Sequence, residues 1–189
     1  IIILMKIYII TGNKHKVSEA KAVFSEFNIE VEQINDQKQE PKEKTITEIS
    51  ELNAKHFYEK YKKPVIVDDT GVFFMAYPNF PGNHPKLMFE LLGYKGLLKL
   101  VENEKREAKF RASVSFYDGQ ALKTAIGDFD CVIDTKVHDL DKDVLAYERI
   151  LLFNGKPISQ YSREEKNKHS HRAKAFREIA IYLTNKRQN

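Results

Sequence analysis

The sequence predicts an α/β protein with a mixed β-sheet. In the first half of the chain, short apolar strands alternate with segments whose apolar residues recur at helical spacing. In the second half, two arms of strand periodicity surround a turn and form a long antiparallel hairpin. Alternating strands and helices favour parallel neighbours, and a hairpin adds antiparallel ones, so we expect both in one sheet.

The elements of the first half follow from periodicity and from helix-start signals. Strands are predicted at 6–10 and 29–34, with a helix over 13–27 between them. The polar stretch 35–44 contains Pro41 and predicts a loop. Thr45 and Glu48 then have the spacing of a capping box, which predicts a helix running to about Tyr61.

The second half begins with the stretch "VIVDDTGVFF", where we expect a buried strand from Val65 that ends at two carboxylates. A loop rich in proline and glycine at 78–85 follows, and then helical patterns to about Val101. The hairpin arms lie at 110–116 and 122–126. A last helix begins at Ser170, with an apolar inner stripe.

Composition fits one globular domain spanning residues 1–189. The chain is 42% hydrophobic and 31% charged, which suits a single well-buried core. Its one cysteine, Cys131, permits no internal disulfide and fits a reducing compartment. The formal charge of +4 does not indicate a nucleic-acid partner, although a basic cleft for a small polyanion would be compatible with it.

The apolar start "IIILMKIYII" predicts a strand buried on both faces. Lys6 interrupts it, whereas a bilayer span needs about 20 apolar residues. It also lacks the features of a signal peptide, so we expect a cytoplasmic protein that does not enter the membrane. Met5 is a candidate natural start, with residues 1–4 as an upstream extension.

The first stretch that could carry chemistry is "TGNKHK", residues 11–16, between a buried strand and a helix start. Unpaired backbone amides and the helix dipole favour an anion there, Gly12 allows close approach, and Lys14 and Lys16 add positive charge. These features predict a phosphate cradle. A plain strand-to-helix turn with Asn13 as the N-cap explains the same residues.

The second is the doubled acid, Asp68 and Asp69. Carboxylates at the carboxyl end of a strand stand where ligands bind in α/β sheets, and a divalent cation relieves their repulsion. Mg²⁺ often bridges one or two carboxylates to substrate phosphates. Because neighbouring strand residues point to opposite sides, we expect one of the two to face the ligand. The alternative is an Asx-turn in "DDTG".

The third is "SREEKNKHSHRAKAF", residues 162–176. Ser170 can cap the last helix and place His171 and Arg172 in its first turn, with Lys166 shortly before. An arginine there opposes the helix dipole and needs a carbonyl, phosphate or carboxylate partner. A solvated basic face is the alternative.

Together, in this order, these stretches resemble the inosine triphosphate pyrophosphatase family, also called Ham1-like. The resemblance runs from about Lys6 to Leu183, and its carriers are "ITGNKHKVSEAK", "VDDTGVFF" with the following "FPG", the region of Lys86, and "EEKNKHSHRAKA". It implies a central, elongated mixed β-sheet flanked by helices, with two lobes and a nucleotide cleft between them, and frequent homodimers. It also implies magnesium-dependent hydrolysis of a nucleoside triphosphate to the monophosphate and pyrophosphate, with Mn²⁺ as an alternative metal.

The resemblance also assigns roles to single residues. Asp69 matches a metal ligand that is the proposed general base, and Asp68 and Glu40 match the other metal-binding acids, with Glu43 as an alternative to Glu40. Residues that match substrate-binding positions are Thr11, Gly12, Asn13, Lys16, Lys55, Thr70, Lys86, Lys166, His171 and Arg172.

One stretch departs from the family, and it is the one implied to select the base. Members carry a Gly-Phe-Gly-Tyr-Asp-Pro loop, for which this chain has "VLAYER", 144–149. Leu145 replaces the aromatic residue that stacks on the purine, Tyr147 is kept, and Glu148 replaces the aspartate. Base stacking is worth about 1–3 kcal/mol in nucleic-acid binders, so base preference is open.

The implied function is the hydrolysis of non-canonical purine nucleotides such as ITP, dITP and XTP, which cleanses the nucleotide pool. Two alternatives stay open: the same chemistry with a changed base preference, and a nucleotide-binding protein with weak turnover.

Overall fold

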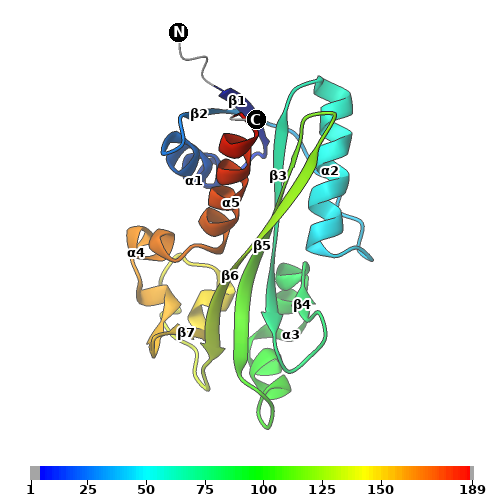
Figure 1. The fold of residues 1–189 in the computed structure, drawn as a ribbon. Helices are drawn as coiled ribbons and strands as arrows, with labels where there is room; N and C mark the ends of the chain where they lie inside the picture. Colours follow the sequence, from blue (N-terminus) through cyan, green and yellow to red (C-terminus); the bar gives the residue numbers. More distant parts are fainter. Residues whose placement is uncertain (1–4, 188–189) are drawn as a thin grey trace. The chain divides into compact units, whose positions relative to one another are not determined.

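The computed structural model describes residues 5–187, which fold around a mixed sheet with the strand order β2-β1-β3-β5-β6-β7-β8 (Figure 1). β1 pairs in parallel with β2 and β3, whereas β3 pairs antiparallel with the short β4, and β7 pairs antiparallel with β6 and β8. The predicted mixed α/β class is therefore confirmed. The proposed extension at residues 1–4 lies outside the described residues. The strands are β1 Met5–Ile10, β2 Ile29–Ile34, β3 Val65–Phe74, β4 Pro81–Gly82, β5 Glu107–Tyr117, β6 Leu122–Ile133, β7 Leu151–Phe153 and β8 Lys156–Pro157.

The predicted helices are present, with ends shifted by a few residues. The helices are α1 Lys14–Ser25, α2 Ile46–Tyr61, α3 Pro85–Leu100, α4 Arg163–Lys168 and α5 His171–Lys186, with 3-10 turns η1 Ala146–Arg149 and η2 Ile158–Gln160. The capping box of Thr45 and Glu48 opens α2 as expected. Within residues 5–187, no helix is both long and apolar enough to span a bilayer.

The chain divides into two compact units, which we describe separately. The first unit contains the described residues of 1–69, 112–127 and 171–189, and the second contains 70–111 and 128–170. Each unit is therefore built from segments that are distant in the sequence. The strands β3, β5 and β6 contribute residues to both.

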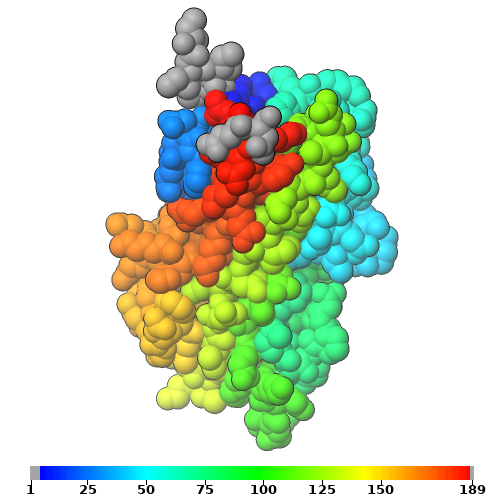
Figure 2. Space-filling view, in the orientation of Figure 1, coloured from blue at the N-terminus to red at the C-terminus, as the bar shows by residue number. Residues whose placement is uncertain are grey.

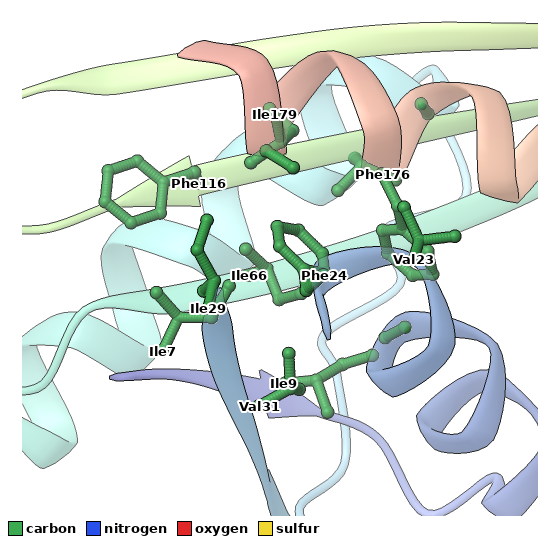
Figure 3. Close-up of a cluster of buried hydrophobic side chains, with 14 of the residues drawn as sticks. Ile7, Ile9, Val23, Phe24, Ile29, Val31, Ile66, Phe116, Phe176 and Ile179 are labelled. Carbon is green, nitrogen blue, oxygen red and sulfur yellow. The ribbon is translucent and has the colours of Figure 1, made fainter. Parts of the chain in front are cut away.

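In the first unit, apolar side chains on both faces of the strands are buried. On one face, Ile7 and Ile9 of β1 and Ile66 of β3 pack with α1 and α5, where the Phe24 and Phe176 rings lie 5.7 Å apart (Figure 3). α1 and α5 also lie side by side in the space-filling view, in blue and red (Figure 2). The other face contacts α2 through a cluster of Ile10, Ala54, Phe57, Val65 and Val67.

The second unit has a core of its own. Val72 and Phe74 of β3 pack there with Leu97 of α3 and Phe129 of β6. α3 is interrupted at Gly93, where φ is 59° and ψ is −175°. This core includes Tyr147 of η1, so the segment that departs from the family pattern is anchored in the unit.

β3 differs from the prediction in one important respect, because it does not end at the two carboxylates. It continues through Asp68 and Asp69 to Phe74. Val72 and Phe73 pair with β4, and burial of the apolar side chains of Val72 and Phe74 stabilises this extension of the strand. The expected strand end, and the Asx-turn offered as its alternative, are both wrong.

Candidate active site

The turn between β1 and α1 is closed by its own hydrogen bonds. Asn13 Oδ1 accepts from the backbone N–H groups of His15 and Lys16 at 2.9 and 3.4 Å, and the Asn13 N–H donates to Thr11 Oγ1 at 3.1 Å. Asn13 is thus the N-cap of α1, as the alternative of a strand-to-helix turn predicted. Gly12 lies against Asn35, whose Oδ1 would be 3.0 Å from a Cβ at position 12. Gly12 and Asn13 remain exposed, so the turn is accessible to a ligand.

Alternation along β3 sends the two carboxylates to opposite faces of the sheet. Ile66 points toward α1 and α5, whereas Val65 and Val67 point toward α2. Because side chains alternate with a period of two, Asp68 continues the first face and Asp69 the second. Their contacts agree with this placement, as the two carboxylates bind different partners.

Asp68 is the centre of a buried cluster of charges. Its Oδ2 lies 2.8 Å from Lys16 Nζ and accepts from Arg172 Nε at 3.0 Å. Arg172 also donates to Glu19 at 2.8 Å. Burial by itself would raise the pKa of Asp68, but Lys16, Arg172 and Lys38 hold the pKa well below its ordinary value. Asp68 is therefore a carboxylate that stays ionised inside the protein.

The second oxygen of Asp68 is different. Oδ1 is buried and has no hydrogen-bond partner among residues 5–187. A buried carboxylate oxygen without a donor or cation is costly, so this atom can accept one more ligand.

Asp69 lies against the loop that follows β2. Its Oδ1 accepts from Lys38 Nζ at 2.6 Å, and the same ammonium donates to the main-chain oxygen of Asp68 at 2.8 Å. Glu40 Oε1 lies 3.6 Å from Lys38 Nζ. Burial raises the pKa of Asp69, and Lys38 offsets part of this increase. A carboxyl group with a raised pKa is the better proton acceptor of the two.

The loop over 35–44 is fixed on both sides of Lys38. The buried Asn53 of α2 accepts from the Gln39 N–H at 2.8 Å and donates to the Gln39 carbonyl at 2.7 Å. Asp36 accepts from Lys60 at 2.6 Å and from the Tyr61 hydroxyl at 2.7 Å. α2 thus holds the backbone that presents Lys38 and Glu40.

The oxygen atoms around Lys38 Nζ are of the kind that binds a metal cation. Among residues 5–187, no three His, Cys, Asp or Glu side chains are grouped closely enough to form a metal centre by themselves. Mg²⁺ requires fewer protein ligands, because it commonly binds one or two carboxylates and completes its shell with water and phosphate. Asp69 and Glu40 therefore fit a divalent ion on the Lys38 face of the sheet, and Oδ1 of Asp68 is a further oxygen donor on the opposite face.

In the second unit, the segment "VLAYER" has one exposed and two buried side chains. Leu145 is 65% exposed, whereas Tyr147 and Glu148 are buried. Glu148 binds Lys166 of α4 at 3.0 Å, and the Tyr147 hydroxyl donates to the Pro85 carbonyl at 2.9 Å. Glu148 and Lys166 thus present a carboxylate and an ammonium side by side.

Comparison with known proteins decides the family. The model of the Ham1 family matches residues 7–182, nearly the whole chain. This chain belongs to the Ham1 family.

Ham1 relatives match in sequence and in fold. The dITP/XTP pyrophosphatase of Saccharolobus solfataricus is 36% identical over 182 residues, covering 95% of this chain and 94% of its own. The dITP/XTP pyrophosphatase of Thermococcus kodakarensis is 32% identical, with 95% and 97% covered. A HAM1 protein from Coxiella burnetii has the same fold, with a TM-score of 0.77 at 18% identity, over 96% of this chain and 99% of that one.

The structure distributes the residues suggested by the Ham1 resemblance over both units. In the first unit it brings Lys16, Asp68 and Arg172 into one cluster, and Glu40 and Asp69 around Lys38. Lys55 is exposed on α2, and His171 begins α5 beside Arg172. In the second unit, Lys86 is 90% exposed near the start of α3, and Thr70 directly follows Asp69 in β3.

Three residues of the site were missing from the sequence analysis. Lys38 and Asn53 organise the surroundings of Asp69, and Glu19 is the second partner of Arg172. The helical spacing of Glu19 and Lys16 along α1 could have suggested a shared face. Nothing in the polar loop distinguishes Lys38 from the lysines at 42 and 44.

Proposed function

We propose that this Ham1-family chain hydrolyses non-canonical purine nucleoside triphosphates, such as ITP, dITP and XTP, to the monophosphate and pyrophosphate. The observation that carries the proposal is the pair of carboxylates in β3. Asp68 is ionised beside Lys16 on one face of the strand, and Asp69 lies beside the Lys38 ammonium on the other. Two relatives are dITP/XTP pyrophosphatases, which supports the same substrate class. Such an enzyme removes damaged nucleotides from the pool.

Asp69 is the proposed general base. A water forms a bond to the α-phosphorus and loses its proton to the Asp69 carboxylate, while the bond from that phosphorus to the bridging oxygen breaks and pyrophosphate leaves. The raised pKa of Asp69 supports this role, because a more basic carboxylate accepts the proton more readily. Asp68 stays ionised and holds Lys16 and Arg172 in place.

The proposed cofactor is Mg²⁺, with Mn²⁺ as an alternative. Asp69 and Glu40 would hold the ion, since they are the carboxylates around the Lys38 ammonium. Asp68, which the resemblance also matches to a metal-binding acid, offers its Oδ1, unpartnered within the described part of the chain, on the opposite face of the sheet. When bound, a divalent ion neutralises charge on the phosphate oxygens. Glu43 remains the alternative to Glu40.

The turn of Thr11, Gly12 and Asn13, together with Lys16, is the proposed phosphate-binding segment, with Lys55, Thr70 and Lys86 as further contacts. Its exposure and its place at the start of α1 support this assignment. Because Asn13 already caps α1, we expect the phosphate to use side chains and the exposed Gly12 more than the first amides of the helix.

Base recognition is proposed for Leu145, Tyr147, Glu148 and Lys166, with His171 and Arg172. The pair of Glu148 and Lys166 supports a 6-keto purine, because the carboxylate can accept from a ring N–H and the ammonium can donate to a keto oxygen. The exposed Leu145 offers an apolar surface and no stacking ring. This observation favours a second candidate, the same reaction with a broader or altered base preference.

We further propose that the protein is a cytoplasmic homodimer. The Ham1 resemblance supports the dimer, and so do the exposed Leu87 and Leu91 of α3, at 40% and 68%. Light scattering coupled to gel filtration measures the assembly, and a monomer at micromolar concentration would contradict the dimer.

The decisive experiment is a substrate panel with a matched pair of variants. Purified protein with Mg²⁺ is given ITP, dITP, XTP, GTP, ATP and dUTP, and monophosphate and pyrophosphate are measured. Asp69→Asn should lower kcat by roughly 10²-fold or more, as expected for removal of one positioned catalytic group. Asp118→Asn is the control, because Asp118 belongs to the hairpin turn and binds Lys186.

Preference for ITP and XTP that disappears in Asp69→Asn, but not in Asp118→Asn, supports the proposed function. Equal turnover of all the triphosphates supports the altered base preference. No turnover, or activity that survives in Asp69→Asn, contradicts the catalytic assignment and favours a nucleotide-binding protein.

A further inference from the structure

Lys38 is the side chain that occupies the position expected for the metal. Its Nζ lies 2.6 Å from Asp69 Oδ1 and 2.8 Å from the main-chain oxygen of Asp68, with Glu40 Oε1 at 3.6 Å. The Lys38 side chain is only 13% exposed, and that of Asp69 only 10%. One ammonium therefore contacts both acids of the proposed metal site on this face of the sheet.

The ammonium remains charged in this environment. A lysine side chain is ordinarily protonated at neutral pH, and this ammonium lies 2.6 Å from the Asp69 carboxylate. A full positive charge thus rests on the oxygens that would coordinate a divalent ion. Two cations cannot share these oxygens at such distances without strong repulsion.

The backbone around Lys38 is fixed, whereas its side chain has rotatable bonds. Asn53 holds the main chain of Gln39, and Lys60 and Tyr61 hold Asp36. The ammonium can therefore leave Asp69 by side-chain rotation, without displacement of the loop that carries Glu40.

We propose that Lys38 is a positioning residue that sets the metal affinity of the site: its ammonium holds Asp69 and Glu40 together without metal and must move before a divalent ion binds. This inference rests on the proposed function, since it requires Asp69 to be a metal ligand. A triphosphate supplies new anionic partners for the displaced ammonium. Metal and nucleotide should consequently bind more tightly together than apart.

The test measures the binding of Mn²⁺ alone to the full chain, from the electron paramagnetic resonance signal of free Mn²⁺. Lys38→Met and Lys38→Gln should lower the Kd for Mn²⁺ about tenfold or more, because the competing charge is removed. Lys38→Arg keeps the charge and should not tighten binding. Lys63→Met removes one positive charge elsewhere in the first unit, where Lys63 lies over the Tyr8 ring, and should leave Kd within about twofold of the wild type.

Asp69→Asn separates this inference from the proposed function. If Asp69→Asn weakens Mn²⁺ binding and the neutral Lys38 variants tighten it, both are supported. If Asp69→Asn weakens binding but the neutral Lys38 variants bind like the wild type or more weakly, the inference is overturned and the metal site stands. If Asp69→Asn binds Mn²⁺ as the wild type does, the metal site and the inference both fail.

Thermal melting of each variant excludes unfolding as the cause of a lost signal. Two neutral variants, Lys38→Met and Lys38→Gln, are used so that the test can still be carried out if one of them does not fold. A folding defect weakens metal binding, whereas the inference requires tighter binding, so the two effects differ in sign.

Discussion

At the scale of single residues, the two neighbouring aspartates of β3 have opposite electrostatic environments. Lys16 and Arg172 hold the pKa of Asp68 below its usual range despite burial, whereas burial raises the pKa of Asp69. Paired carboxyl groups whose pKa values are pushed apart divide the roles of permanent charge and proton acceptor. The sequence could predict that these two residues face opposite sides, but their separate partners come from distant segments of the chain.

Arg172→Gln tests the buried cluster around Asp68. Removal of one partner leaves a buried carboxylate with less compensation, so the free energy of unfolding should fall by about 3 kcal/mol. Urea unfolding followed by circular dichroism measures the change. In the double variant with Asp68→Asn, part of this loss should be recovered, because the uncompensated charge is gone. A single variant as stable as the wild type would show that the cluster contributes no net stability.

Asp36 provides a prediction for the dependence of stability on pH. Hydrogen bonds from Lys60, Tyr61 and the Gln37 N–H lower its pKa from 3.8 to about 2. The stabilisation is therefore fully present above pH 3.8 and is lost as the pH falls toward 2. The stability difference between the wild type and Asp36→Asn should shrink over this range in urea unfolding. A difference that is constant with pH would contradict the role of the carboxylate.

At the scale of elements, local patterns predicted the helices well and the ends of β3 poorly. α2 was predicted from its capping box, which the structure contains. β3 was expected to stop at the two carboxylates, with an Asx-turn in "DDTG" as the alternative, but pairing with β4 and burial of Phe74 extend the strand beyond them. α4 was not predicted, although Ser162 and Glu165 form a capping box, because the helix is short and has no buried residues.

Asn53 connects α2 to the loop that carries Lys38 and Glu40, so Asn53→Ala should affect stability and activity together. The variant loses hydrogen bonds to both main-chain groups of Gln39, which should lower the free energy of unfolding by about 1–3 kcal/mol. Activity on ITP should fall as well, because Glu40 is less well placed. The matched control is Asn103→Ala at an exposed position. Equal effects of the two substitutions would contradict the anchoring role of Asn53.

Gly127 fixes how closely β6 approaches the start of α5. A Cβ at this position would lie 1.8 Å from the His171 carbonyl oxygen, a backbone atom that cannot rotate away. Gly127→Ala should therefore lower the free energy of unfolding by about 1–3 kcal/mol or more, as overpacking does. Calorimetric unfolding is the measurement. A variant with unchanged melting temperature would show that α5 can shift without cost.

At the scale of the whole molecule, the fold class and most elements could be predicted from the sequence, and the resemblance implied two lobes, but the segments that make up each unit could not be predicted. Periodicity reports local structure, whereas each unit combines segments that are far apart in the chain. The resemblance pointed to Lys16, Asp68 and Arg172, which the structure brings together. Lys38 was missed because a polar loop carries no periodic signal that marks the residues contacting a strand. Asn53 was missed because a polar residue of helix α2 does not belong to the apolar pattern that indicates a buried face.

The discontinuous make-up of the first unit has a consequence for synthesis. The chain is made from its N-terminus, so β1, α1, β2 and β3 leave the ribosome before β6 and α5 exist. Arg172, which donates a hydrogen bond to Asp68, is synthesised 104 residues after it. Until α5 is made, the nascent protein carries the Asp68 carboxylate with Lys16 as its cationic partner but without Arg172, beside an uncovered apolar face, and chaperones have their clearest opportunity to bind it then.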